Sequence, residues 1–339
     1  MAYIDPGQTD PSRTVQYQYD QVGNRTAVID NGMVTPYTTN ALNEYTAVGD
    51  TQYGYDADGN MTSSTVGSVT TTYTYNTENQ LVGIQSPTDT WSYSYDALGN
   101  RVGETHNGVA TQFVIDPAGL GNVAAEYDAS GNLIARYDNG YGLISQTDAS
   151  GNPGYYTFSA IGNTSEVTGA TGNVLDSYSY DPFGVSLFKS ETTPNAFQYV
   201  GEYGVADDGS GLNFMRARPY IGSEGRFTQE DPSGLLGGLN AYRYAMNAPT
   251  EFVDPTGLGG SFEVDPSEPT PNIPLNQRGP TGTPFIVTRP PDSSEFTNWY
   301  QGDIPAWPSG LSPYSFIITP DVVRTYFHND ELLKKICKP

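Results

Sequence analysis

The chain has 339 residues, of which 36% are hydrophobic, with a formal net charge of −23. This length and apolar content allow two ordinary domains with a buried core, which excludes a disordered polymer. The acidic balance argues against nucleic-acid binding by the repeats described below and against attachment to anionic membranes, since both need clustered Lys and Arg.

The sequence carries few targeting or redox signals. It contains no stretch of about 20 apolar residues, so we expect no membrane span. No basic-led apolar segment opens the chain, so we expect a secreted or cell-surface location, reached by a leaderless route or through an N-terminal region that this sequence lacks. The single cysteine, Cys337, cannot form an intrachain disulfide.

A repeated phrase, Tyr-Asp-x-x-Gly-Asn, organises the first 200 residues with a period near 20. The 26 tyrosines and 38 glycines favour strands and turns over helices, so we expect an all-β chain. Full copies of the phrase begin at Tyr19, Tyr55 and Tyr95. Looser copies place further anchors at positions 40, 76, 116, 138, about 159 and 181.

Each repeat makes physical sense as a β-hairpin. Alternating tyrosines give a strand one aromatic face, and Asp-x-x-Gly-Asn closes a turn through an Asp side-chain bond and a glycine at positive φ. Nine such units give about eighteen strands, more than the roughly ten that a twisted open sheet tolerates, so the sheet should wrap. Exposed tyrosine rows would suit cell-surface carbohydrate, whereas tyrosines buried in the sheet explain the pattern equally well.

Two Asp-Pro-x-Gly-Leu cassettes stand out in the segment 216–258. They begin at Asp231 and Asp254 and frame a glycine- and tyrosine-rich run from Gly237 to Tyr244. A single Asp-Pro is most simply a turn initiator, because Asp bonds back to the backbone and Pro fixes φ. Two carboxylates in matching settings also suggest a pair that works together.

These residues resemble the core of the Rhs/YD-repeat family of polymorphic toxins and insecticidal toxin-complex shells. The likeness extends to the Gly-Arg-Phe at 225–227, the Tyr-x-Tyr at 242–244, Asn247, Pro249 and the Arg-x-Arg at 216–218. It implies a strip of hairpins that spirals into a partial or complete shell, with the core as a plug at one end. We therefore expect repeats over 1–200, a core segment over 201–258 and a variable C-terminal region of mixed or irregular structure over 259–339.

The resemblance also implies self-cleavage. In such proteins the two aspartates form an aspartic-protease-like pair helped by an upstream arginine, which here are Asp231, Asp254 and Arg218, with the cut between Leu258 and Gly259. Carboxylates held close together cannot both ionise, so such a pair serves as acid and base, and which residue takes which role stays open. The family's aromatic-Tyr-Asp-Pro is replaced by 219–222, Pro-Tyr-Ile-Gly, so a different turn is expected after Arg218.

The tail, residues 259–339, differs in composition. It holds 13 of the 25 prolines and three of the 26 tyrosines. We expect a Pro-rich extended part, short strands near 285–287 and 315–318, and a last helix over 320–338. His328 and Cys337 are the only residues of their kind there, too few for a zinc site, so we expect no metal and no cofactor, and we name no catalytic tail residue.

The leading hypothesis is a β-shell that encapsulates or presents a C-terminal effector, freed by self-cleavage and used against competing bacteria. Its expected partners are the chain's own tail as cargo, a cognate immunity protein and a secretion-system component. Eighteen strands close to a diameter of about 27 Å, and an 81-residue globule is about 30 Å across. We therefore expect the tail to lie outside, or upstream repeats to complete the shell. The alternative is a non-enzymatic cell-surface or adhesion repeat protein.

Overall fold

The computed structural model describes residues 2–3, 13–259 and 262–263. The chain divides into two units, 1–288 and 289–339, and every described residue lies in the first. The strands predicted at 285–287 and 315–318, the helix predicted over 320–338, and His328 and Cys337 lie outside the described residues.

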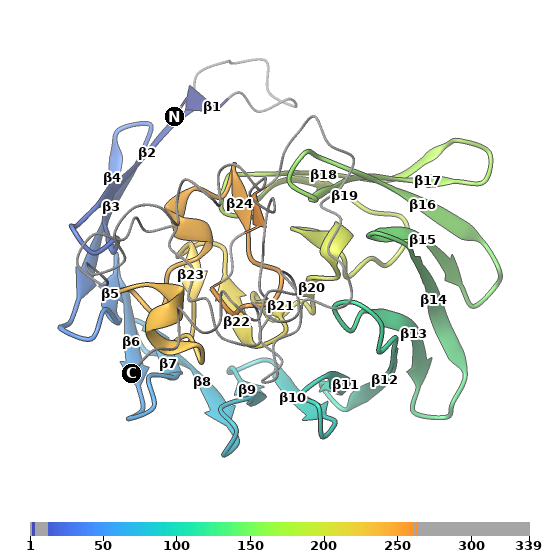
Figure 1. Ribbon diagram of the computed structural model, residues 1–339, viewed down its shortest axis with the longest axis horizontal. Helices are drawn as coiled ribbons and strands as arrows, with labels where there is room; N and C mark the ends of the chain where they lie inside the picture. Colours follow the sequence, from blue (N-terminus) through green and yellow to red (C-terminus); the bar gives the residue numbers. More distant parts are fainter. Residues whose placement is uncertain (1, 4–12, 260–261, 264–339) are drawn as a thin grey trace, which may run out of the picture. The chain divides into compact units, whose positions relative to one another are not determined.

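One long antiparallel sheet dominates the described part of the chain (Figure 1). Each strand from β1 to β19 pairs with the next in sequence. The predicted all-β strip of hairpins is confirmed, since β1 is a two-residue strand and the other eighteen come from the repeats. The strands are β1 (Ala2–Tyr3), β2 (Arg13–Tyr19), β3 (Arg25–Asp30), β4 (Met33–Thr39), β5 (Tyr45–Val48), β6 (Thr51–Tyr55), β7 (Met61–Val66), β8 (Val69–Tyr75), β9 (Leu81–Gln85), β10 (Thr90–Tyr95), β11 (Arg101–His106), β12 (Val109–Ile115), β13 (Val123–Asp128), β14 (Leu133–Asn139), β15 (Leu143–Asp148), β16 (Pro153–Phe158), β17 (Thr164–Gly169), β18 (Val174–Tyr180) and β19 (Ser186–Ser190).

The Asp-x-x-Gly-Asn phrase closes its turns as predicted. The Oδ1 atom of Asp20 accepts hydrogen bonds from the backbone N–H groups of Val22 and Asn24, while Gly23 takes a φ of +86°. The side-chain amide of Asn24 donates to the other carboxylate oxygen. The copies that begin at Tyr55 and Tyr95 repeat all of these bonds.

The repeat turn predicted at position 138 is wrong. Asp138 lies inside β14, where its carboxylate accepts the hydroxyl of Ser145 on β15. The chain turns after Asn139 instead, where the N–H of Gly140 donates to the carbonyl of Gly142. No Asp-x-x-Gly follows position 138, so nothing local fixed the turn at the predicted place.

Tyrosines of the repeats make hydrogen bonds between neighbouring hairpins. The hydroxyl of Tyr75 donates to the carbonyl of Met61, and Tyr95 makes the same bond to Leu81, 14 residues upstream in each case. Tyr93 is 6% exposed. These tyrosines are therefore structural, although Tyr141 and Tyr155 remain exposed.

The core segment is made of short elements. They are η1 (Gly201–Tyr203), β20 (Ala206–Asp207), β21 (Asn213–Met215), β22 (Arg218–Ile221), β23 (Arg226–Phe227), η2 (Gly234–Gly237), η3 (Ala245–Asn247), β24 (Phe252–Val253) and β25 (Phe262–Glu263), the last lying just beyond it. Strands β20 to β23 form a four-stranded sheet. The residues after Arg218 continue as β22, which pairs with β21 and β23.

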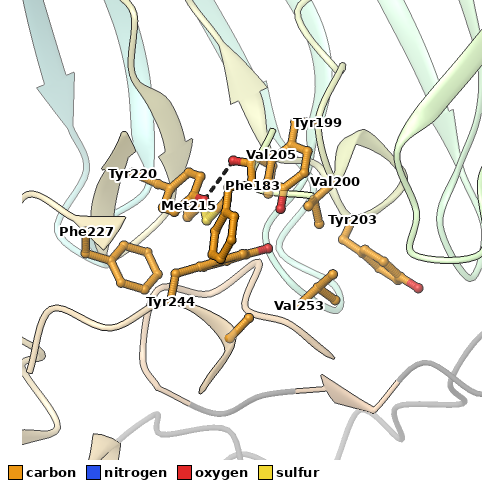
Figure 2. Close-up of a cluster of buried hydrophobic side chains, with 11 residues drawn as sticks. Phe183, Tyr199, Val200, Tyr203, Val205, Met215, Tyr220, Phe227, Tyr244 and Val253 are labelled. Atoms are coloured by element: carbon orange, nitrogen blue, oxygen red, sulfur yellow. Dashed lines mark hydrogen bonds between the residues drawn. The ribbon is translucent and has the colours of Figure 1, made fainter. Parts of the chain in front are cut away.

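Aromatic side chains join the core segment to the last hairpins (Figure 2). The rings of Tyr220 and Tyr244 lie 4.4 Å apart, and the hydroxyl of Tyr220 donates to the carbonyl of Phe183 in the turn after β18. Tyr199, Tyr220 and Tyr244 are all fully buried. Aromatic residues of this size dominate the burial energy of a core.

Polar contacts attach the core segment to strands far apart in the sheet. Tyr53 on β6 donates to Glu224, and Arg101 on β11 pairs with Asp208. Further along, the N–H of Glu202 donates to the carbonyl of Gly162, between β16 and β17. The sheet therefore bends around the core segment, which fills its inner face at each of these points.

Candidate active site

Arg218 organises the site from the start of β22. Its side chain is 1% exposed, and its guanidinium carbon lies 3.7 Å from the centroid of the Phe227 ring. The Nε atom donates to the carbonyl of Gly257, and Nη1 donates to that of Ala241 at 2.7 Å. Burial lowers the pKa of Arg218, although an arginine remains charged in such a setting. These bonds aim the remaining nitrogen, Nη2, at the carboxylates.

Asp231 lies between β23 and η2, with its backbone N–H bonded to the carbonyl of Ala241. Its Oδ2 atom is 2.9 Å from Nη2 of Arg218. Its Oδ1 atom accepts the backbone N–H of Ser233 at 2.8 Å and the hydroxyl of the same residue at 2.5 Å. Both oxygens of Asp231 are therefore held in place.

Asp254 follows β24 and is 1% exposed. Its Oδ2 atom lies 3.6 Å from Nη2 of Arg218 and accepts the N–H of Gly259 at 2.9 Å. Its Oδ1 atom accepts the hydroxyl of Thr256 at 2.9 Å and the N–H of Leu258 at 3.3 Å. Burial raises the pKa of the Asp254 carboxyl above its ordinary value, while the charge of Arg218 acts in the opposite direction.

The Leu258–Gly259 peptide bond lies beside both carboxylates. Its nitrogen, on Gly259, donates to Asp254, and the carbonyl oxygen of Leu258 is 3.5 Å from the hydroxyl of Ser233. The carbonyl one residue earlier is held by Arg218. The structure thus brings together all five residues named from the sequence.

Ser233 was not named from the sequence, yet a signal for it was present. The two cassettes read Asp-Pro-Ser and Asp-Pro-Thr, so each aspartate has a hydroxyl residue two positions later. Ser233 donates to Asp231, and Thr256 donates to Asp254 in the same way. The cassettes are turns as well as a carboxylate pair, so the two interpretations of Asp-Pro are compatible.

The repeats hold the site from outside the core segment. The side-chain amide of Gln229, two residues before Asp231, donates to the side-chain oxygen of Asn60 at 2.8 Å. The hydroxyl of Tyr242 donates to the carbonyl of Gly59 at 2.9 Å. Both contacts involve the turn between β6 and β7, so this turn helps to set the position of Asp231.

Two buried carboxylates that share one guanidinium nitrogen provide the elements of acid and base chemistry at a peptide bond. Within the described residues, no three histidine, cysteine or carboxylate side chains gather as a metal site would require. In that same part of the chain, no helix is long and apolar enough to cross a membrane.

A family model described as Teneurin YD-shell matches residues 6–250. The tRNA3(Ser)-specific nuclease WapA of Bacillus spizizenii is 32% identical over 258 residues, which cover 72% of this chain and 11% of that protein. The toxin protein Tse5 of Pseudomonas aeruginosa is 47% identical over 70 residues, 20% of this chain and 5% of that protein. The chain therefore spans about a tenth or less of the length of these relatives.

A solved structure with a similar arrangement is that of TcdB2-TccC3-Cdc42. It matches 75% of this chain and 17% of that chain, with 15% sequence identity and a TM-score of 0.46.

Proposed function

The chain belongs to the Teneurin YD-shell family, and from this premise we propose that it cuts itself between Leu258 and Gly259 and releases its C-terminal segment. One observation carries the proposal. The Oδ2 atoms of Asp231 and Asp254 lie 2.9 and 3.6 Å from the same nitrogen of Arg218, beside that peptide bond.

The reaction is hydrolysis of one peptide bond. A water oxygen bonds to the carbonyl carbon of Leu258 while one carboxylate accepts a water proton. The carbon–nitrogen bond then breaks as the other carboxyl donates its proton to the nitrogen of Gly259. The products are a carboxylate on Leu258 and an amine on Gly259. Neither a metal nor an oxidant is needed.

The surroundings of the two carboxyls favour different roles. Burial raises the pKa of Asp254, which favours its protonated form, and its Oδ2 atom already contacts the nitrogen of Gly259. Asp254 thus suits the proton donor. Asp231 has the shorter contact with Arg218, and this position suits the proton acceptor. The titration still belongs to the pair as a whole.

The released segment is proposed to act as an effector in competition between bacteria. The support is that relatives of this chain carry the names toxin Tse5 and tRNA nuclease WapA. The repeats and core would present or enclose the segment, the cell would export it to the surface or beyond, and a cognate immunity protein would protect the producer. A secretion-system component and a cell-surface carbohydrate are further proposed partners.

The test compares purified full-length chains on a denaturing gel. Wild type should give two pieces, while Asp231→Asn and Asp254→Asn should each give one band near 36.6 kDa. Asp96→Asn is the matched control, because Asp96 makes comparable Asp-turn bonds in an exposed repeat turn, and it should still give two pieces. An intact wild type would favour the alternative of a non-enzymatic adhesion protein. A cut Asp231→Asn chain would contradict the proposed role of Asp231 in the cleavage.

A further inference from the structure

We infer that the first residue of the released segment must be glycine, because Gly259 occupies a site that excludes a side chain. This inference rests on the proposed self-cleavage and makes Gly259 a specificity-determining residue for it. It concerns the residue that supplies the nitrogen of the cleaved bond. The acid and base chemistry of the two aspartates does not by itself restrict which residue this is.

Gly259 lies against Gly237 and Asp231. A Cβ atom at position 259 would lie 2.7 Å from the Cα of Gly237 and closer still to Oδ2 of Asp231, whereas ordinary contact begins near 3.4 Å. A Cβ atom at position 237 would also overlap Oδ2 of Asp231. The two glycines therefore enclose the carboxylate oxygen that Arg218 binds.

The surrounding atoms cannot move aside easily. The contact at Gly237 is with backbone, and Asp231 is held by Arg218 through Oδ2 and by Ser233 through Oδ1. Any side chain at position 259 must consequently shift the backbone of the bond by more than half an ångström, or push Asp231 away from it. Misplacing reacting groups by about 1 Å can cost about a hundredfold in rate.

The backbone of Gly259 adds a second restriction, since its φ is +69°. Most residues with a side chain avoid this region, but asparagine tolerates it. Asparagine still carries a Cβ atom. Gly259→Asn therefore separates the two restrictions, because it relieves the backbone strain and keeps the contact with Asp231.

Gly234 offers a matched control within the same cassette as Asp231. Its φ is +62°, and a Cβ atom there would meet nothing within 4 Å. Gly234→Ala thus carries a similar backbone strain and lies three residues from Asp231, without the steric contact. Gly237→Ala tests the steric contact from the other glycine, because the Cβ atom that it adds would overlap Oδ2 of Asp231.

The experiment follows cleavage of the full chain over time after cell-free synthesis is stopped, with the melting temperature of each variant measured alongside. We expect Gly259→Ala, Gly259→Asn and Gly237→Ala to cut about a hundredfold more slowly than wild type, and Gly234→Ala to cut at close to the wild-type rate. Wild-type rates for Gly259→Ala or Gly259→Asn would overturn the inference, as would equal slowing by Gly234→Ala. An uncut wild type would refute the proposed self-cleavage itself.

Discussion

Replacing Arg101 by methionine should destabilise the whole repeat-and-core unit. Arg101 on β11 pairs with Asp208 of the core segment at 2.9 Å, and both side chains are 5% exposed. The guanidinium carbon also lies 4.0 Å from the ring centroid of Tyr93 and 3.9 Å from that of Phe214. Methionine keeps most of the packing volume and removes the charge.

The expected cost follows from the burial of the pair. Removing one partner leaves the other charge unpaired in the interior, which costs about 3–5 kcal/mol. In a protein of this size, each kcal/mol lowers the melting temperature by about 2–4 °C, so a fall of about 6–20 °C is expected. Arg13 provides the control, because its ion pair with Asp30 is 37% and 38% exposed and should contribute about 0–1 kcal/mol.

The assay is denaturant unfolding followed by circular dichroism, for Arg101→Met, Asp208→Asn, Arg13→Met and the double variant Arg101→Met with Asp208→Asn. The double variant leaves no unpaired charge, so its cost should be less than the sum of the two single costs. A cost for Arg101→Met within about 1 kcal/mol of that for Arg13→Met would refute the reasoning that buried polar contacts couple the repeats to the core.

Three further predictions concern the cavity, the site and the tail. Burial and the charge of Asp208 raise the pKa of Glu104, which lines a cavity of about 100 Å³ beside Arg101, to about 7. The folded state therefore keeps a proton that the unfolded state loses between about pH 4.5 and 7. Glu104→Gln should thus stabilise the protein by about 1–3 kcal/mol at pH 8 and hardly at all at pH 4.5, as measured by unfolding at both pH values. Equal effects at the two values would contradict this. Ser233→Ala removes a bond to Asp231 and should slow cleavage about tenfold or more in the same gel assay, with Ser210→Ala as the control, and an unchanged rate would exclude a positioning role. Expression of residues 259–339 alone should inhibit growth of a bacterium, and the absence of a growth defect in any compartment would count against an active effector.

The repeat turns could be predicted from the sequence because their bonds are local. Asp20 contacts groups two and four residues ahead, so the phrase Asp-x-x-Gly-Asn contains its own turn. The prediction at Asp138 was wrong because glycine and asparagine do not follow it at the third and fourth positions, as they follow Asp20, and the turn formed at Gly140 instead.

The candidate site was only partly predictable. The resemblance supplied Asp231, Asp254 and Arg218, and the proximity that the structure gives them was expected. The contact of Gly237, at the end of η2, with Gly259 joins residues 22 positions apart, and no local pattern in the sequence brings the two together. The pair of Arg101 and Asp208 spans 107 positions, and nothing in either stretch of sequence marks the partner.

The most direct test of self-cleavage is N-terminal sequencing, with intact mass, of the fragments from purified wild-type chain. The proposal predicts a new N-terminus that reads Gly259-Gly260-Ser261, and its absence from the Asp231→Asn chain. A wild-type chain that keeps a single mass of 36.6 kDa, or a new N-terminus at any other residue, would contradict the assignment of Asp231 and Asp254 to this bond.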